Sequence, residues 1–126
     1  MSKYAARKAV VDGIAFDSRK EARRYGELSL LLRAGKITDL ELQKRYELIP
    51  AQYETFERYG KRGQRLKDGQ RCVEKSVVYV ADFTYKQDGQ TIVEDTKGYQ
   101  RGTAYDVFVI KRKLMLYIHG IKIREV

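Results

Sequence analysis

Two apolar segments joined by an Asp-Gly turn lie past the middle of this chain and constrain its fold more than any other stretch. Residues 77–85 are rich in Val, Phe and Tyr, and residues 91–96 follow after a turn at 87–90 that contains Asp88-Gly89. Val, Phe and Tyr favour strands, and Asp-Gly favours the tight turn of a hairpin. The sequence therefore predicts an antiparallel hairpin over residues 77–96.

Charged side chains interrupt this hairpin where apolar ones are expected. Asp82 falls inside the first strand, and Asp95 precedes Lys97 by two residues at the end of the second. A carboxylate in a buried strand is costly unless it is paired or holds a metal ion. Because side chains alternate along a strand, Asp95 and Lys97 are expected on one face and Glu94 on the other. We therefore predict an active site at Asp82, Asp95 and Lys97, and a structural role for Glu94.

Each of these side chains also has an ordinary interpretation. Asp82 could form a salt bridge with one of the chain's many cations, and Asp95 with Lys97 could be a surface pair on a strand. The position of Asp82 between Ala81 and Phe83 favours a functional role, because an isolated charge there has no structural advantage.

Length, charge and the rare residue types narrow the class of protein. The 126 residues suit one domain, and no apolar run approaches the ~20 residues that span a membrane. One cysteine, Cys72, excludes an internal disulfide, and one histidine, His119, argues against a histidine-based metal site. The net charge of +9 indicates a polyanionic partner, with nucleic acid the first candidate and a ribosomal or coating role the alternative. We expect no membrane association, no small-molecule cofactor and a cytoplasmic location.

A capped amphipathic helix is predicted between Ser18 and Gly35. Ser18 and Glu21 have the spacing of a capping box, and glycine commonly stands just past a helix end. Glu21 keeps two interpretations. Its carboxylate either caps the backbone of Ser18, or lies at the end of the buried helix face and reaches a metal ion.

The remaining segments complete a mixed fold. Apolar patterning predicts a hairpin at 9–16, strands at 37–42 and 45–49, a helix at 105–118 and a strand at 121–126. This order of helices and strands indicates one α/β (α+β) domain over residues 1–126, with a mixed β-sheet flanked by helices.

Residues 51–71 lose the apolar patterning and gain positive charge. Tyr53, Phe56 and Tyr59 alternate with acids, and a glycine-rich run of cations follows. A flexible basic arm or hairpin of this kind could grip phosphates, whereas a solvated loop that keeps the protein soluble is the alternative. The cations expected to contact nucleic acid in this stretch are Arg62, Arg65 and Lys67.

The acidic hairpin also carries a family resemblance. Asp82, followed by Asp95-Thr96-Lys97 on the next strand and then a basic helix, resembles the PD-(D/E)XK nuclease signature. In that superfamily the preceding helix commonly supplies a further acid, which Glu21 matches. From VVDGIAFDSRKEARRY to IKIREV, nearly the whole chain is also similar to small phage and prophage proteins of unassigned function in this restriction-endonuclease-like superfamily. Ala81 departs from the signature, because a proline usually precedes the first acid.

The resemblance implies a restriction-endonuclease-like fold and a Mg²⁺-dependent DNA endonuclease that hydrolyses phosphodiester bonds, with Mn²⁺ as the alternative metal. Hard carboxylate oxygens suit Mg²⁺, which keeps several of its waters. Asp82 and Asp95 are expected to bind the metal, with Glu21 as a third ligand, directly or through water. Lys97 is expected to stabilise negative charge at the scissile phosphate, since neighbouring carboxylates oppose the lowered pKa that a lysine base needs.

Lys20, Lys111 and Lys113 are further candidates for phosphate contacts, with solvated lysines as the alternative. Gln43 is a polar candidate near the site. The nearest functional analogy is to RecU-type Holliday-junction resolvases, which implies phage DNA recombination or replication, branched DNA and a homodimer that makes paired cuts.

Two other functions remain open at this point. One is a nonspecific or flap DNA nuclease. The other is a non-catalytic nucleic-acid-binding protein that keeps the nuclease fold. The acidic residues argue against the second, because Asp82 and Asp95 repel a phosphate backbone unless a cation lies between them.

Overall fold

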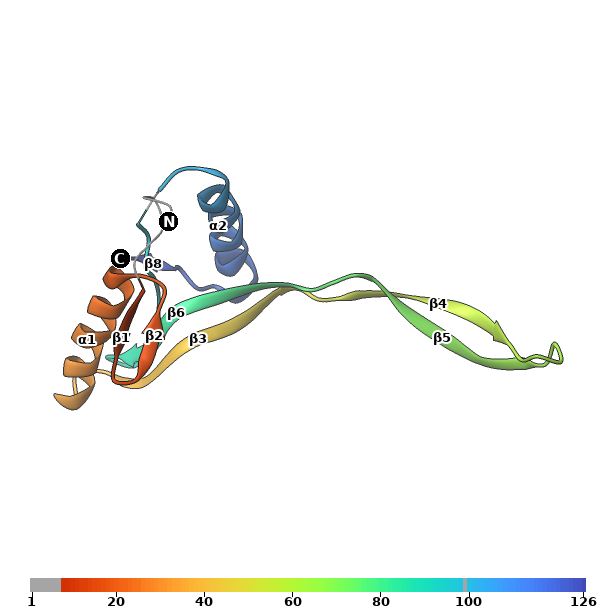
Figure 1. The fold of residues 1–126 in the computed structure, drawn as a ribbon, viewed down its shortest axis with the longest axis horizontal. Coiled ribbons are helices and arrows are strands. Elements are labelled where there is room, and N and C mark those ends of the chain that lie inside the picture. Colours follow the sequence, from red (N-terminus) through yellow and green to blue (C-terminus); the bar gives the residue numbers. More distant parts are fainter. Residues whose placement is uncertain (1–7, 99) are drawn as a thin grey trace.

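Two helices pack on a mixed four-stranded sheet, and a long two-stranded arm projects from it (Figure 1). The computed structural model describes residues 8–98 and 100–126. The helices are α1 (Arg19–Arg33) and α2 (Thr103–Leu114), and α2 runs on into a π-helical segment, η1 (Met115–His119). The strands are β1 (Ala9–Val11), β2 (Ile14–Phe16), β3 (Thr38–Ile49), β4 (Gln52–Tyr59), β5 (Arg65–Glu74), β6 (Val77–Gln87), β7 (Gln90–Asp95) and β8 (Arg124–Glu125).

The central sheet has the strand order β3-β6-β7-β8. β6 is antiparallel to both of its neighbours, β3 and β7, whereas β8 is parallel to β7. A parallel neighbour requires a crossover connection, which α2 and η1 provide. The predicted α+β class with a mixed sheet is confirmed. Among the described residues, neither helix combines the length and apolarity needed to cross a membrane.

Both predicted Asp-Gly hairpins are confirmed. Asp12-Gly13 joins β1 to β2, and Asp88-Gly89 joins β6 to β7. In each turn both residues have positive φ, 53° and 77° in the first and 52° and 77° in the second. Two such residues make a type I′ turn, whose twist matches that of the flanking strands.

The first helix begins where its cap predicts. Ser18 is the N-cap, and its hydroxyl accepts the Glu21 backbone N–H at 3.1 Å. Gly35 follows the C-cap with φ of 72°, a conformation that glycine adopts without steric cost.

Two predicted strand boundaries are wrong. The segments expected at 37–42 and 45–49 form one strand, β3, which begins at Thr38 and in which Gln43 has a φ of 55°. The apparent gap in the sequence pattern is therefore a local distortion of a continuous strand. The final strand is confined to Arg124–Glu125, although Ile123 is buried as its apolar character predicted.

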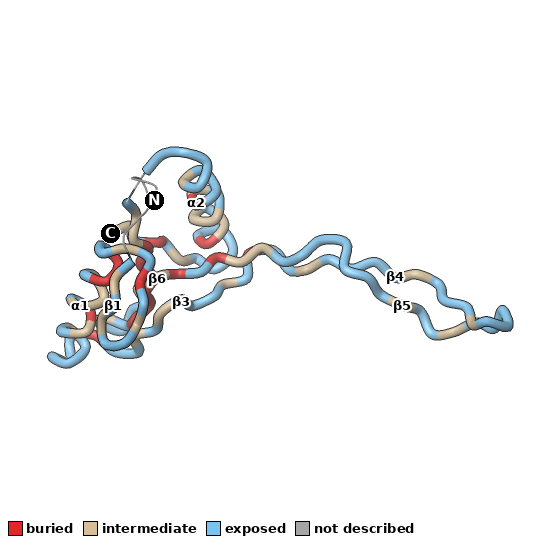
Figure 2. Tube along the Cα trace, viewed as in Figure 1, coloured by how far each residue is buried: buried red, intermediate tan, exposed pale blue. Residues whose placement is uncertain are grey.

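The stretch expected to be a basic arm, loop or hairpin is a hairpin. β4 pairs with β5, and residues 60–64 join them at the tip. We call residues 50–76 the arm. It continues the β3–β6 pair outward from the sheet, starting at Pro50 (Figure 1). Figure 2 shows the arm exposed along almost its whole length, with buried residues gathered at the other end of the molecule.

The buried residues form two clusters that meet along β6. Tyr79 and Ala81 belong to the cluster that includes Phe108 of α2. Phe83 belongs to a second cluster, with residues of α1, β2 and the start of β3. Asp82 therefore lies on the central strand at the boundary between the two cores.

Candidate active site

The hairpin of β6 and β7 brings the two predicted aspartates to adjacent strands. Its register pairs Phe83 with Glu94, so Asp82 and Asp95 are opposite one another one step further along. Asp82 is half-buried, and its Oδ2 accepts the backbone N–H of Thr96 at 2.8 Å. The structure thus juxtaposes the two acids 13 positions apart that the sequence singled out.

Asp95 is nearly buried, at 5% exposure, and has a defined partner for each oxygen. The Tyr79 hydroxyl donates to Oδ2 at 2.7 Å, and the Lys97 ammonium lies 3.0 Å from Oδ1. Burial, followed by the charge of Asp95, raises the pKa of Tyr79, so Tyr79 remains a neutral donor. Lys97 also lies 3.9 Å from the centroid of the Phe108 ring, a cation–π contact that fixes its head group.

Glu21 faces the same region from α1. Its backbone N–H is capped by Ser18, but its carboxylate accepts the Gln43 side-chain amide at 3.4 Å. Among the described residues no bond returns from this carboxylate to the Ser18 backbone, so only half of the predicted capping box is present. Gln43 reaches Glu21 from a left-handed backbone position, which is uncommon for a residue other than glycine and concentrates at functional sites.

The three carboxylates influence one another electrostatically. Burial, the charge of Asp95 and that of Glu21 together raise the pKa of Asp82 to about 7, against the opposing bond from Thr96. Burial, with the charges of Asp17 and Asp95, raises the pKa of Glu21. The Lys97 ammonium, within bonding distance of Asp95, contributes a positive charge beside these acids.

This donor set suits a divalent cation that binds oxygen. In the described ranges, the side chains do not form a group of three or more His, Cys, Asp or Glu already arranged to hold a metal ion. Mg²⁺ needs only one or two carboxylates, because it keeps several of its waters. Asp82 and Asp95 are the residues that could hold it directly, and Glu21 could be a third ligand, directly or through water.

Cations flank the acids on two sides. On the α1 side, the Lys20 ammonium donates to the Lys97 backbone carbonyl at 2.6 Å. Lys20, Arg23 and Thr96 line a depression of ≈ 220 Å³ there, and the Thr96 hydroxyl is buried without a partner among the described residues. On the α2 side, Lys111 lines a second depression of ≈ 230 Å³ together with Asp95 and Lys97.

The other predicted nucleic-acid contacts lie elsewhere. Lys113 is exposed on α2, two residues after Lys111 and so on a different side of the helix. Arg62, Arg65 and Lys67 are at the far end of the arm, well away from the acids (Figure 1).

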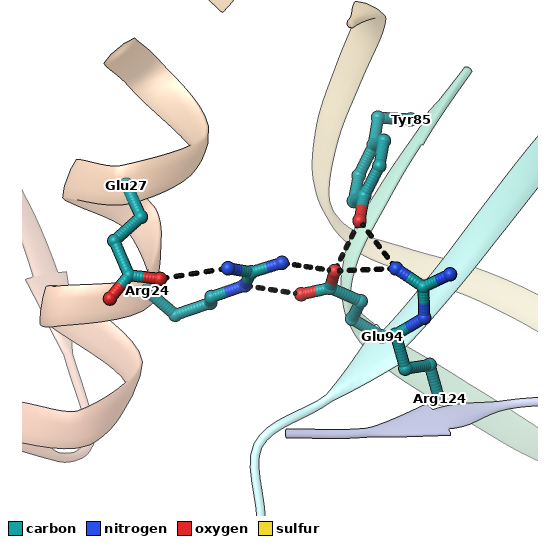
Figure 3. Close-up of polar contacts among 5 residues, drawn as sticks. All are labelled: Arg24, Glu27, Tyr85, Glu94 and Arg124. Carbon is teal, nitrogen blue, oxygen red and sulfur yellow. Dashed lines mark hydrogen bonds and ion pairs between the residues drawn. The ribbon is translucent and has the colours of Figure 1, made fainter. Parts of the chain in front are cut away.

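Glu94 contacts a different set of side chains from Asp95, as alternation predicted, and lies at the centre of a charge cluster (Figure 3). It is fully buried, and its two oxygens accept bonds of 2.8 and 2.7 Å from the Arg24 guanidinium of α1. The Tyr85 hydroxyl also donates to it, and Arg124 of β8 lies 3.9 Å away. Burial acts to raise the pKa of Glu94, but the bonds from Arg24 and Tyr85 lower it overall.

This cluster helps to position the candidate acids. It ties α1 to β6, β7 and β8 through Arg24, Tyr85, Glu94 and Arg124 (Figure 3). Because Glu21 precedes Arg24 by three residues on α1, the same bonds hold Glu21 near the site.

Several contacts of the site were not found by sequence reasoning. Tyr79 and Phe108 lie beside Asp95 and Lys97 but read as ordinary core residues. The sequence gives no signal for the contacts of Arg23 and Arg24 at the site, because Arg24 binds Glu94, 70 positions away in the chain, and Arg23 lines a depression with the similarly distant Thr96. Only the polar character of Gln43 within a strand gave a signal.

Comparison with known proteins assigns a family without an activity. A family model described as "Protein of unknown function (DUF1064)" matches residues 1–124. No curated protein and no solved structure matches the chain.

Proposed function

The chain belongs to the DUF1064 family, and we propose that it is a Mg²⁺-dependent DNA endonuclease whose active site is formed by Asp82, Asp95, Glu21 and Lys97. One observation carries this proposal. A chain with a net charge of +9 places Asp82 opposite Asp95 with Glu21 facing them, and burial, followed by neighbouring carboxylates, raises the pKa of both Asp82 and Glu21. Such repulsion is costly unless a cation offsets it when the protein works.

The residues present fit the bound metal that the resemblance implies. Asp82 and Asp95 would hold Mg²⁺, with Glu21 as a third ligand directly or through water, and Mn²⁺ would suit the same oxygens. The metal would supply a nucleophile from water near neutral pH and neutralise charge on the phosphate. Tyr79 orients Asp95 through its hydroxyl, and Gln43 orients Glu21.

Lys97 contributes a fixed positive charge. Its ammonium is held between the Asp95 carboxylate and the Phe108 ring, at the edge of the depression that also contains Lys111. From there it stabilises the negative charge that develops on a phosphate in the transition state. Lys20 and Arg23 on α1 can bind the adjoining phosphates, so the DNA strand would run past the acids from α1 to α2.

The arrangement of elements supports the superfamily resemblance. The first acid is on β6, the Asp-x-Lys motif ends β7, the additional acid comes from the helix α1, and the basic helix α2 follows. A role in phage recombination or replication, branched DNA as substrate and a homodimer that makes paired cuts are part of the same proposal.

A cleavage assay tests this function. The wild type and Asp82→Asn would be incubated with labelled four-way junction, flap, linear duplex and single-stranded DNA, in Mg²⁺, Mn²⁺ or EDTA. We expect metal-dependent cutting by the wild type and a loss of roughly 10³-fold or more in Asp82→Asn. Asp88→Asn is the matched control, because it makes the same change in an exposed turn where asparagine is favoured.

Metal binding gives a readout independent of cutting. We expect millimolar Mg²⁺ to raise the melting temperature of the wild type and of Asp88→Asn, but not of Asp82→Asn. Tight DNA binding without cutting under any metal would replace the nuclease with a non-catalytic nucleic-acid-binding protein. Equal cutting by Asp82→Asn would show that the site is wrongly assigned.

A further inference from the structure

Contacts between side chains of the arm itself stabilise its shape without packing against the core. The Phe56 ring lies across Gly69 on the paired strand, where a Cβ would approach the ring to 2.4 Å. Arg71 stacks over Phe56 at 4.4 Å and pairs with Glu54 at 3.0 Å. Glycine covered by a cross-strand aromatic is a recognised device for ordering an exposed ribbon. The arm is therefore a structured projection.

Positive charge accumulates toward the far end of the arm. Residues 57–68 contain five cations and two acids. Both acids are already engaged, since Asp68 pairs with Arg65 at 2.5 Å and Glu57 accepts the Tyr59 hydroxyl at 2.6 Å. The cations at this end with no carboxylate partner among the described residues are Arg58, Lys61, Arg62 and Lys67.

Aromatic rings are exposed beside these charges. Tyr59 is 57% exposed and its ring lies 5.7 Å from Arg65, while Tyr53, 62% exposed, lies nearer the base of the arm, where it pairs with Cys72. A ribbon with unpaired cations and exposed aromatic rings is suited to a polyanion, because a protein partner of ordinary composition would leave those charges without partners.

The arm and the active site are parts of one hairpin. β5 leads through residues 75–76 into β6, so Lys67 precedes Asp82 by 15 residues along an almost continuous strand. At about 3.3 Å per residue, Lys67 is on the order of 50 Å from the acids. That distance corresponds to roughly 15 base pairs of duplex at about 3.4 Å each.

We propose that the arm is a duplex-binding ribbon that contacts DNA phosphates roughly 15 base pairs from the scissile bond, and so sets a minimum duplex length on one side of the cut. The inference rests on the proposed function for the position of that bond. A two-stranded β-ribbon fits the major groove of B-DNA, which leaves the cations at the tip beside the phosphates that border the groove.

A variant without the arm, called the arm-less variant, tests whether the arm sets a minimum duplex length. Ile49 and Val77 are partners in the ladder, so replacing residues 50–76 by Asn-Gly closes the hairpin with the turn that such a pair accepts. Binding in EDTA would be measured on duplexes from about 8 to about 30 base pairs, and cleavage in Mg²⁺ on the same series. We expect wild-type affinity to rise about tenfold or more once the duplex exceeds roughly 15 base pairs, and the arm-less variant to show no such step.

A milder pair of variants keeps the test decisive if the arm-less chain fails to fold. Lys61→Gln with Arg62→Gln removes two cations from the tip, and Arg33→Gln with Lys36→Gln removes two exposed cations near the far end of α1. We expect the first pair to reduce the slope of log affinity against log salt by about 2, at about 0.9 per phosphate contact, and the control pair to leave it unchanged.

The outcomes separate this inference from the proposed nuclease. Length-dependent binding without cleavage under any metal would support the DNA-binding role of the arm and contradict the proposed nuclease activity. Cleavage with the same length dependence in the wild type and the arm-less variant would overturn the inference about the arm and support the proposed nuclease activity. If removing the arm changes the sedimenting mass and leaves DNA binding per protomer intact, the arm is a protein interface and the inference is wrong.

Discussion

The inner half of the long hairpin, β3 with β6, and its outer half, β4 with β5, use the same antiparallel pairing but differ in what stabilises them. The inner half contributes side chains to two buried clusters, and the candidate acids lie beside these clusters. The outer half has no buried residue and relies on rings, glycine and cations of its own (Figure 2). Strand pairing alone therefore does not tell whether a ribbon belongs to a core. The side chains that cover it decide this.

Truncating one phenylalanine in each half should give the largest contrast. Phe83 is fully buried between α1 and β2, whereas Phe56 packs on the arm alone. We expect Phe83→Ala to lower the free energy of unfolding by about 3–5 kcal/mol, and Phe56→Ala to change it by less than about 1 kcal/mol. Urea denaturation followed by circular dichroism measures both. Equal losses would mean that the arm unfolds as one unit with the core.

Breaking one ion pair beside the inner half, between α1 and β7, and one within the outer half should give a smaller contrast. Glu94→Gln leaves the Arg24 guanidinium beside a buried neutral amide, while Glu54→Gln affects an exposed pair with Arg71. We expect losses of about 3 kcal/mol for the first change and less than about 1 kcal/mol for the second. Added salt should abolish the effect of Glu54→Gln and leave most of that of Glu94→Gln. Comparable, salt-sensitive losses would show that the Glu94 cluster is solvated.

Removing one acid from the site should have the smallest effect, and one of opposite sign. The folded-state pKa of Asp82 is raised to about 7, so ionisation destabilises the metal-free protein, and stability falls as pH rises from about 4 toward 7. We expect Asp82→Asn to raise the free energy of unfolding on the order of 1 kcal/mol at pH 8 in EDTA, with a flatter pH dependence below pH 7. Thermal unfolding across pH measures this. A destabilised Asp82→Asn would show that the carboxylate is a structural partner.

The contrast between the two halves also explains which parts of the fold the sequence predicts. The strands of residues 77–96 contain runs of buried residues and share an Asp-Gly turn, so their apolar side chains and that turn predict the hairpin. β4 and β5 are exposed on both faces, so their sequence lacks the apolar pattern of a half-buried strand and does not distinguish an arm or hairpin from a loop. The break expected near Gln43 reflects a distorted backbone within β3, which hydrophobic pattern cannot distinguish from a loop.

The candidate site likewise has residues that the sequence predicts and contacts that only the fold reveals. Asp82, Asp95 and Lys97 could be found because charges within an apolar hairpin are conspicuous. The contacts that orient them depend on residues far apart in the chain, such as Arg24 with Glu94, 70 positions away. No local pattern specifies such a pairing. Glu21 satisfied two local interpretations at once, and only the fold shows its carboxylate turned toward Gln43.

The pairing of Ile49 with Val77 at the base of the arm has a consequence for how such a protein can diverge. Removing or adding equal numbers of residues on both strands beyond this pair changes the length of the ribbon, while every residue of the inner ladder keeps its partner. A change in one strand alone would instead shift the register there. The length of the ribbon can thus vary among descendants of one ancestor while the pairing of β3 with β6, and with it the position of Asp82, stays constant.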